Sequence, residues 1–251
     1  MSLPTNDEIG VWVAAHIGQF HAKRLERLTT LDLRDVLRRK NPYLFRAKNI
    51  RTAEQLVRAL LDAHLSSQEE TMFGDFLETL AIWINAHAFG GRKSGIPGID
   101  LEFDRDGTRF IVAIKSGPNW ANSQQLKRLR DNFRQAARTL RTSGAGVSLQ
   151  AVNGCCYGRD ANEDKGDHLK LCGQAFWTFI SGSESLYVDI VEPLGTDARQ
   201  HNEAFEQAYA LVVNRMTRTV VADFLDGNAA IDWPRLLAFN SGRTPPRRAR
   251  G

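Results

Sequence analysis

Apolar residues recur at helical spacing over the first part of the chain and again over its last part. Ile9, Val13, Ile17 and Phe20 are separated by four, four and three residues, which predicts an amphipathic helix over residues 8–28. The same spacing predicts helices over 31–37, 52–64, 68–87, 197–225 and 233–239. The Asn41-Pro42-Tyr43 segment interrupts the pattern, and Thr52 and Ser66 are suitable starts for the two helices that follow them.

Strand patterns occupy the middle of the chain. Residues 98–103 and 110–117 are two short apolar segments joined by Asp104-Arg105-Asp106-Gly107, which predicts a hairpin. Residues 146–157 and 175–180 predict a third and a fourth strand. A long helix is expected between the second and third strands, ending near Thr142 and capped by Asn122 or Ser123. These elements predict an α/β (α+β) fold with a central mixed sheet flanked by helices and with helical N-terminal and C-terminal segments.

Three charged residues stand on the two apolar segments of this hairpin, 98–103 and 110–117. Because strand side chains alternate between faces, Asp100 and Glu102 share one face of the first strand, and Ala113 and Lys115 share one face of the second. If the two faces coincide, two carboxylates and an ammonium group converge at the end of a sheet. This is the minimum set that can hold a divalent metal against a phosphodiester and direct a water molecule at its phosphorus.

Several segments together resemble the PD-(D/E)XK nucleases. The longer resemblance is to the type II restriction endonucleases of that superfamily. The segments that carry the resemblance are 66–78 (SSQEETMFGDFLE), 98–103 (GIDLEF), 114–124 (IKSGPNWANSQ), 154–158 (GCCYG) and 172–177 (CGQAFW). The resemblance implies a restriction-endonuclease-like sheet and hydrolysis of double-stranded DNA at a short specific site. We expect one nuclease domain over 1–251, with a helical segment at 1–66, a catalytic core at 67–190 and a C-terminal helical segment at 191–240. The end of the chain is basic and rich in proline, which predicts a disordered tail at 241–251.

The resemblance also assigns roles to individual residues. Asp100 matches the family's metal-binding aspartate, Lys115 its catalytic lysine, and Glu78 the helix glutamate that precedes the core. The position two residues before the lysine is usually acidic in the family, but here it is Ala113. The standard second carboxylate is therefore absent, and Glu102, then Glu78, are the candidates to replace it.

A cofactor and partners follow from the same resemblance. Asp100, one of these two glutamates and the backbone carbonyl of Ile114 would hold Mg²⁺, while Lys115 would position the attacking water. A twofold DNA site would call for a symmetric homodimer. A cognate DNA methyltransferase in the same system and the cytoplasm of a prokaryotic cell are the expected context.

Basic and amide side chains close to the hairpin are candidate DNA contacts. The glycine-rich loop 90–98 carries Arg92 and Lys93 but lacks the Walker spacing, so nucleotide hydrolysis is rejected as its role. Amides and an indole follow the lysine strand, as groove-reading groups would, and a basic stripe lies on the next helix with Asp131 as its only nearby acid. The candidate DNA-binding residues are Arg92, Lys93, Ser116, Asn119, Trp120, Asn122, Gln124, Lys127, Arg130 and Arg134.

A second basic cluster lies in the N-terminal segment. It consists of Arg38, Arg39, Lys40, Arg46, Lys48 and Arg51. Such clusters are usually solvated surface, but on a nuclease this one would be a natural phosphate contact.

Composition sets limits on these interpretations. The 251 residues are 42% hydrophobic, which is enough to build the core of one compact unit. A formal net charge of +4 permits a polyanionic partner. The three cysteines are an odd number, and we expect no disulfide framework, no secretory leader and no membrane span.

Other functions were weighed against the nuclease. Cys155, Cys156, His168 and Cys172 are legitimate zinc ligands but lack the usual spacing, and no pattern singles out one thiol or one serine as a nucleophile. The charges on the hairpin also suit a weak surface salt bridge. Two alternatives within DNA biochemistry stay open: a nuclease-like module that binds DNA without cutting it, suggested by Ala113, and a processing nuclease without sequence preference.

Overall fold

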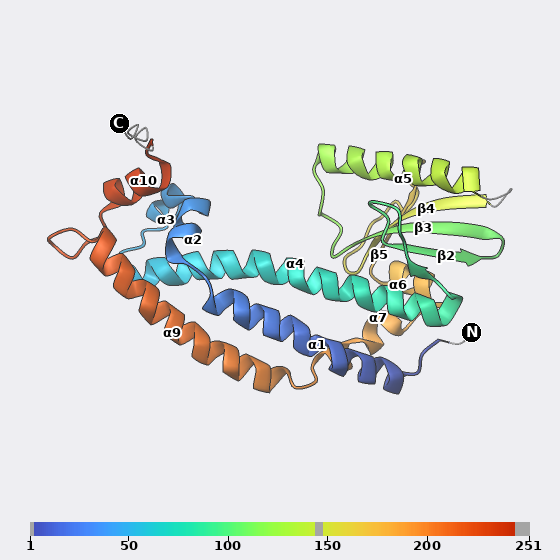
Figure 1. Ribbon diagram of the computed structural model, residues 1–251, viewed down its shortest axis with the longest axis horizontal. Helices are drawn as coiled ribbons and strands as arrows, with labels where there is room; N and C mark the ends of the chain where they lie inside the picture. The colour runs from blue at the N-terminus through green and yellow to red at the C-terminus, as the bar shows by residue number, and fades with distance from the viewer. Residues whose placement is uncertain (1–2, 144–147, 244–251) are drawn as a thin grey trace, which may run out of the picture. The chain divides into compact units, whose positions relative to one another are not determined.

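The structure, a computed structural model, describes residues 3–143 and 148–243. The chain divides into two compact units, unit 1 with Met1–Phe20 and Glu70–Ala198 and unit 2 with His21–Glu69 and Arg199–Gly251. Two long helices, α1 (Asn6–Thr29) and α4 (Ala53–Phe89), contribute residues to both units. The class is mixed α/β as predicted, because a mixed five-stranded sheet is flanked by helices and the described N-terminal and C-terminal segments are helical (Figure 1).

Unit 1 is built around the sheet, whose strands lie in sequence order. They are β1 (Arg92–Lys93), β2 (Leu101–Arg105), β3 (Thr108–Lys115), β4 (Ser148–Cys155) and β5 (Leu169–Cys172). The β1–β2 and β2–β3 pairs are antiparallel, while β3–β4 and β4–β5 are parallel. A parallel pair needs a crossover connection, and α5 (Ser123–Ser143) supplies it between β3 and β4.

Side-chain alternation gives the sheet two different faces. One face carries Leu101, Val112 and Ile114 into the core formed with α4 and α6 (Gln174–Ser181). The opposite face carries Ile111 and Ala113 against the apolar side of α5 (Figure 1). Two short helices, α7 (Leu186–Asp189) and α8 (Val191–Leu194), complete the unit. Strand β3 is therefore held by packing on both faces of the sheet.

Unit 2 is helical. Its remaining elements are α2 (Leu33–Arg39), α3 (Pro42–Ala47), α9 (Ala198–Phe224) and α10 (Trp233–Ser241). Leu56, Leu60 and Leu61 of α4 pack with Val213 and Val220 of α9 in its core. Because every one of these side chains is apolar and buried, unit 2 has a hydrophobic core of its own.

Most predicted elements are confirmed. The first helix, the hairpin, the α5 crossover, the strand at β4 and the two C-terminal helices occur where the spacing placed them. Residues 146 and 147 of the third predicted strand, and residues 244–251 of the predicted tail, lie outside the described residues. Among the described residues, no helix is both long enough and apolar enough to cross a membrane.

Two predicted elements are wrong. Residues 52–64 and 68–87 form one continuous helix, α4, so Ser66 does not begin a helix. Residues 175–180 are helical within α6 and do not form a strand. The strand that follows β4 is instead β5, which ends before α6 begins. A short apolar run does not distinguish a strand from a buried helix, and the four residues of β5 are too few to show a period.

Close packing between β4 and α6 gives the first testable prediction. A Cβ atom on Gly154 would lie 2.2 Å from Cε2 of Phe176, which is fully buried. We expect Gly154→Ala to lower the free energy of unfolding by about 1–3 kcal/mol, as overpacking does, measured by urea denaturation. Gly95→Ala is the control, because its Cβ meets nothing within 4 Å. Equal unfolding midpoints for the two variants would contradict this packing.

Candidate active site

Asp100 and Lys115 meet at the end of the hairpin, as the alternation of side chains predicted. The backbone N–H of Asp100 donates to the carbonyl of Val112 at 2.8 Å, which extends the β2–β3 pairing by one residue. Its carboxylate Oδ2 accepts a hydrogen bond from the Ile114 amide at 2.6 Å. Lys115 Nζ lies 3.7 Å from the same Oδ2 and donates to the Ile114 carbonyl at 2.7 Å. The ammonium group therefore lies between a carboxylate and a carbonyl oxygen.

Glu78 of α4 brings a second carboxylate to this region. Its side chain is 26% exposed, and Oε1 lies 3.6 Å from Nζ of Lys93. Burial raises the pKa of Glu78, the negative charge of Asp100 raises it further, and the charges of Lys93 and Lys115 oppose these effects. Two carboxylates that repel each other in a partly buried place are the arrangement that a bound cation would stabilise.

Glu78, Ile114 and Lys115 line a cavity of about 510 Å³. Asp100 is not among the lining residues, but it contacts both Ile114 and Lys115. Glu70, Asp75 and Glu78 of α4 line one side of it, and Lys115 with the loop after β3 lines another. Glu70, Asp75 and Tyr157 also line the cavity, although the sequence pattern did not single them out. Asp75 had a usable signal, because residues three apart lie on the same side of a helix and Asp75 is three residues before Glu78.

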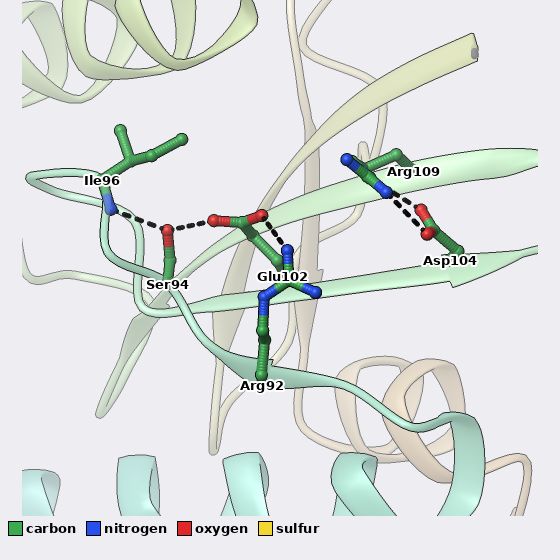
Figure 2. A network of polar contacts seen from close by, with 6 residues as sticks. All are labelled: Arg92, Ser94, Ile96, Glu102, Asp104 and Arg109. Carbon is green, nitrogen blue, oxygen red and sulfur yellow. Dashed lines mark hydrogen bonds and ion pairs between the residues drawn. The ribbon is translucent and has the colours of Figure 1, made fainter. Parts of the chain in front are cut away.

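Glu102 shares the sheet face of Asp100, but it lies further from the lysine. It pairs with Ile111 in the strand register, four residues before Lys115. Its carboxylate accepts hydrogen bonds from Ser94 Oγ and from Arg92, at 3.4 Å for the latter (Figure 2), and the residue is only 5% exposed. Glu102, like Asp100, is not among the residues that line the cavity, but Asp100 contacts two residues that are, Ile114 and Lys115. Its partners were hidden from the sequence, since they depend on how the loop 90–98 returns along β2.

The candidate DNA contacts after β3 fall into two groups. Ser116, Asn119 and Trp120 line the cavity, and the ring of Trp120 has its centre 5.4 Å from Lys115 Nζ. Asn122 instead caps the start of α5. Its side chain accepts a hydrogen bond from the Gln125 amide at 3.0 Å, and the Gln125 side chain accepts one from the Asn122 amide at 2.8 Å. The predicted cap at Asn122 is thus confirmed, and Gln124 is exposed in the first turn of α5.

Acidic partners balance more of the basic stripe than the sequence suggested. Arg130 lies 3.2 Å from Asp167, which belongs to the loop before β5, and Arg134 lies 3.1 Å from Asp131. Lys127 is exposed and has no ion pair within the described part of the chain. In β1, Arg92 forms an ion pair with Glu102, and Lys93 forms one with Glu78. The two basic side chains are nevertheless 69% and 72% exposed.

The donors at this site suit a hard divalent cation. Within residues 3–143 and 148–243, no three His, Cys, Asp or Glu side chains form a group that could hold a metal ion. The site offers two carboxylates, from Asp100 and Glu78, and the carbonyl oxygen of Ile114. Magnesium is usually held by one or two carboxylates together with water and substrate phosphates, so this oxygen set fits it.

The cysteines do not supply a competing chemistry. Cys155, Cys156 and Cys172 are free and buried. Burial raises the pKa of Cys156 to about 12, and the neighbouring charge of Glu78 acts in the same direction. A thiol that stays protonated at neutral pH is a poor nucleophile and a poor metal ligand. The prediction that these residues act as small buried apolar groups agrees with their burial.

The raised pKa of Glu78 gives a prediction for stability in the absence of metal. The folded protein holds the Glu78 proton more tightly than the unfolded chain does, so stability should fall as pH rises through the raised pKa. We therefore compare the melting temperatures of Glu78→Gln and of the unmodified protein in EDTA. The difference, variant minus unmodified, should increase from pH 4 to pH 8. Glu192→Gln, at an exposed position, should show no such gain. A constant difference for Glu78→Gln across this range would contradict the assignment.

A comparison with known families agrees with this geometry. None of the curated proteins matches the chain. The family model described as Type II restriction endonuclease EcoO109I matches residues 7–202. This range covers most of the chain and contains the whole sheet, the loop after β3 and Glu78. The chain therefore belongs to the family of the type II restriction endonuclease EcoO109I, which makes it a site-specific deoxyribonuclease by family.

Proposed function

We propose that the protein is a PD-(D/E)XK enzyme that uses Mg²⁺ to hydrolyse phosphodiester bonds in double-stranded DNA at a short specific site. Membership of the family gives restriction endonuclease activity and a DNA substrate. The observation that carries the finer proposal is the meeting of the Lys115 ammonium, the Asp100 carboxylate and the Ile114 carbonyl beside a cavity that Glu78 also lines. We propose residues 67–190 as the catalytic core within a single nuclease domain.

Asp100, Glu78 and the carbonyl of Ile114 are the proposed metal ligands. Magnesium supplies Lewis acidity, which favours negative charge on phosphoryl oxygens and on water. Asp100 is already oriented by the hydrogen bond from the Ile114 amide, and it lies 3.7 Å from Lys115, which lines the cavity. A bound cation would favour the charged form of Glu78, against the burial and the Asp100 charge that raise its pKa.

Lys115 is the proposed catalytic lysine. Its side chain is 31% exposed, and its ammonium group has donors beyond the one used on Ile114. From this position it can donate to the attacking water and to the oxygens on which charge develops in the transition state. Such a fixed donor stabilises the transition state more than the ground state, which is the requirement for a faster reaction.

Glu78 is a better candidate than Glu102 for the second carboxylate. Glu78 lines the cavity and lies close enough to Asp100 for their charges to interact. Glu102 is satisfied by Ser94 and Arg92 and is almost fully buried. We therefore reverse the order of preference that the sequence suggested.

DNA contacts and assembly complete the proposal. Ser116, Asn119 and Trp120 would contact DNA at the mouth of the cavity. The flanking candidates would contact its backbone or groove: Arg92, Lys93, Asn122, Gln124, Lys127, Arg130 and Arg134. A symmetric homodimer would match a twofold DNA site, and we propose a cognate DNA methyltransferase in the same system and a place in the cytoplasm of a prokaryotic cell.

One observation favours a second candidate function. Ala113 is fully buried in the cluster formed with α5, so β3 carries no acid at the position two residues before Lys115. A module that binds DNA without cutting it would tolerate this gap. The two functions differ in whether magnesium permits scission.

Incubation of a plasmid with the purified protein, with magnesium or with EDTA, tests the proposal. We expect linear fragments only with magnesium, and mapping of the fragment ends should give one short common sequence. Gel shift without scission under any magnesium concentration would favour the binding module. Scission at ends that share no sequence would instead indicate a processing nuclease.

A further inference from the structure

Segment 38–51 of unit 2 concentrates positive charge to an extent found nowhere else among the described residues of that unit. It contains six cations and no acid: Arg38, Arg39, Lys40, Arg46, Lys48 and Arg51. Five of them are exposed, and only Lys40 is partly covered. Nothing in the proposed function uses these residues, which lie outside the cavity and outside unit 1.

The fold holds this segment in a defined conformation. Asp32 caps the start of α2 by accepting from the amides of Arg34 and Asp35, and Asn41 caps the start of α3 by accepting from Tyr43. Asn240 of α10 donates to the carbonyls of Leu37 and Lys40 at 2.6 and 3.2 Å. Two carbonyl groups at the end of α2 therefore have a partner on α10, which fixes the link between α2 and α3 to the rest of unit 2.

Apolar burial then orients the charges outward. Leu37 and Phe45 are buried in the core of unit 2, and Pro42 is buried as the first residue of α3. Because α2 and α3 are each anchored by an apolar face, the cations on the remaining faces are directed to solvent.

Few of these cations are neutralised within the protein. Arg38 lies 3.2 Å from Asp35, and Lys40 donates to the Ala63 carbonyl at 2.7 Å. Within the described ranges, Arg39, Arg46 and Lys48 have no carboxylate within ion-pair distance. The charges of Lys40 and Arg39 also add to burial in lowering the pKa of His64.

We propose that segment 38–51 is a second DNA-contact surface, which binds the phosphate backbone without reading its sequence. The proposal rests on DNA being the substrate, as the proposed function requires. A rigid surface of unpaired cations releases condensed counterions when it meets a row of phosphates, which is the main source of sequence-independent affinity. Exposed Tyr43, which is 65% accessible in the middle of the segment, adds a hydroxyl donor of the kind that commonly contacts phosphate.

Binding in EDTA tests this surface without requiring metal or cleavage. The test variant is Arg39→Gln/Arg46→Gln/Lys48→Gln, and the matched control is Arg27→Gln/Arg199→Gln/Arg218→Gln, which removes the same charge from exposed positions elsewhere in unit 2. Fluorescence anisotropy with a labelled duplex would give the association constant from 50 to 200 mM salt. Circular dichroism and the melting temperature would verify that both variants fold, and the single variants Arg39→Gln and Lys48→Gln should show graded effects.

We expect the slope of log K against log salt to be smaller by about 2–3 for the test variant, since each phosphate contact contributes about 0.9. When salt rises from 50 to 200 mM, the association constant of the unmodified protein should therefore fall by a factor roughly 40 times larger than that of the test variant. The change should be the same on cleavable and on unrelated duplexes, because phosphate contacts carry no sequence information.

Several results would overturn the inference. An unchanged slope in the test variant, or an equal change in the control variant, would show that segment 38–51 makes no specific contribution. Weaker binding to vesicles of phosphatidylserine with DNA affinity intact would assign the surface to membranes instead. Tight DNA binding that depends on this segment, in a protein that never cuts in magnesium, would overturn the proposed nuclease and leave this inference standing.

Discussion

Lys115→Ala is expected to reduce the rate of DNA cleavage in magnesium by about 10³-fold or more. The variant loses the ammonium group that lies 3.7 Å from Asp100 and bonds the Ile114 carbonyl. Removal of one fixed donor that stabilises transition-state charge typically costs 10²–10³-fold, and loss of the group that positions water adds to this. Single-turnover cleavage of a labelled duplex under excess enzyme measures the chemical step directly.

DNA affinity should change little in the same variant. Lys115 is one of many cations that we propose as DNA contacts, so the dissociation constant measured in EDTA should stay within a few-fold of the unmodified value. Lys23→Ala, which alters an exposed lysine of unit 2, is the control and should cleave normally. Retained cleavage near the unmodified rate in Lys115→Ala would remove this residue from the mechanism.

Glu78→Gln and Glu102→Gln should have very different effects on cleavage. Glu78 lines the cavity and interacts with the charge of Asp100, so its amide variant should lose about 10²-fold in rate and need more magnesium for half-maximal activity. Glu102 is bound by Ser94 and Arg92 away from the cavity, and Glu102→Gln should retain the rate within about tenfold. Measurement of the rate against magnesium concentration for both variants gives the comparison.

The reverse order of effects would restore the preference derived from the sequence. Glu102→Gln would then have to abolish cleavage while Glu78→Gln remained active. Melting temperatures of both variants serve as the control, because Glu102 is almost fully buried and its amide variant has to be folded for the comparison to hold.

The hairpin and the Asp100–Lys115 pair could be predicted from the sequence because both depend on local rules. Strand alternation alone places the two residues on one face, and the structure brings them to 3.7 Å. Alternation says nothing about distance along the strand, so it also favoured Glu102. The contacts that separate Glu102 from the cavity come from Arg92 and Ser94, and they depend on the path of a loop.

Long-range partners account for the other differences. Arg130 looked unpaired because Asp167, its partner at 3.2 Å, is 37 residues away in the sequence. The segment Ala175–Ile180 looked like a strand, but Gly173 and Gly182 at its ends adopt positive φ angles of 55° and 82° and bound a helix. Glycine tolerates such angles, and nothing in the apolar run itself distinguishes the two conformations.

The most direct test of the central claim is the position of the metal. A crystal of the protein with a cleavable duplex and Mn²⁺ in place of Mg²⁺ would locate the ion by its anomalous scattering. The account predicts a peak that contacts the carboxylates of Asp100 and Glu78 and the carbonyl of Ile114, with Lys115 beside the scissile phosphate. A peak at Glu102, or a bound duplex whose phosphates lie away from Asp100 with no ion near it, would contradict the account.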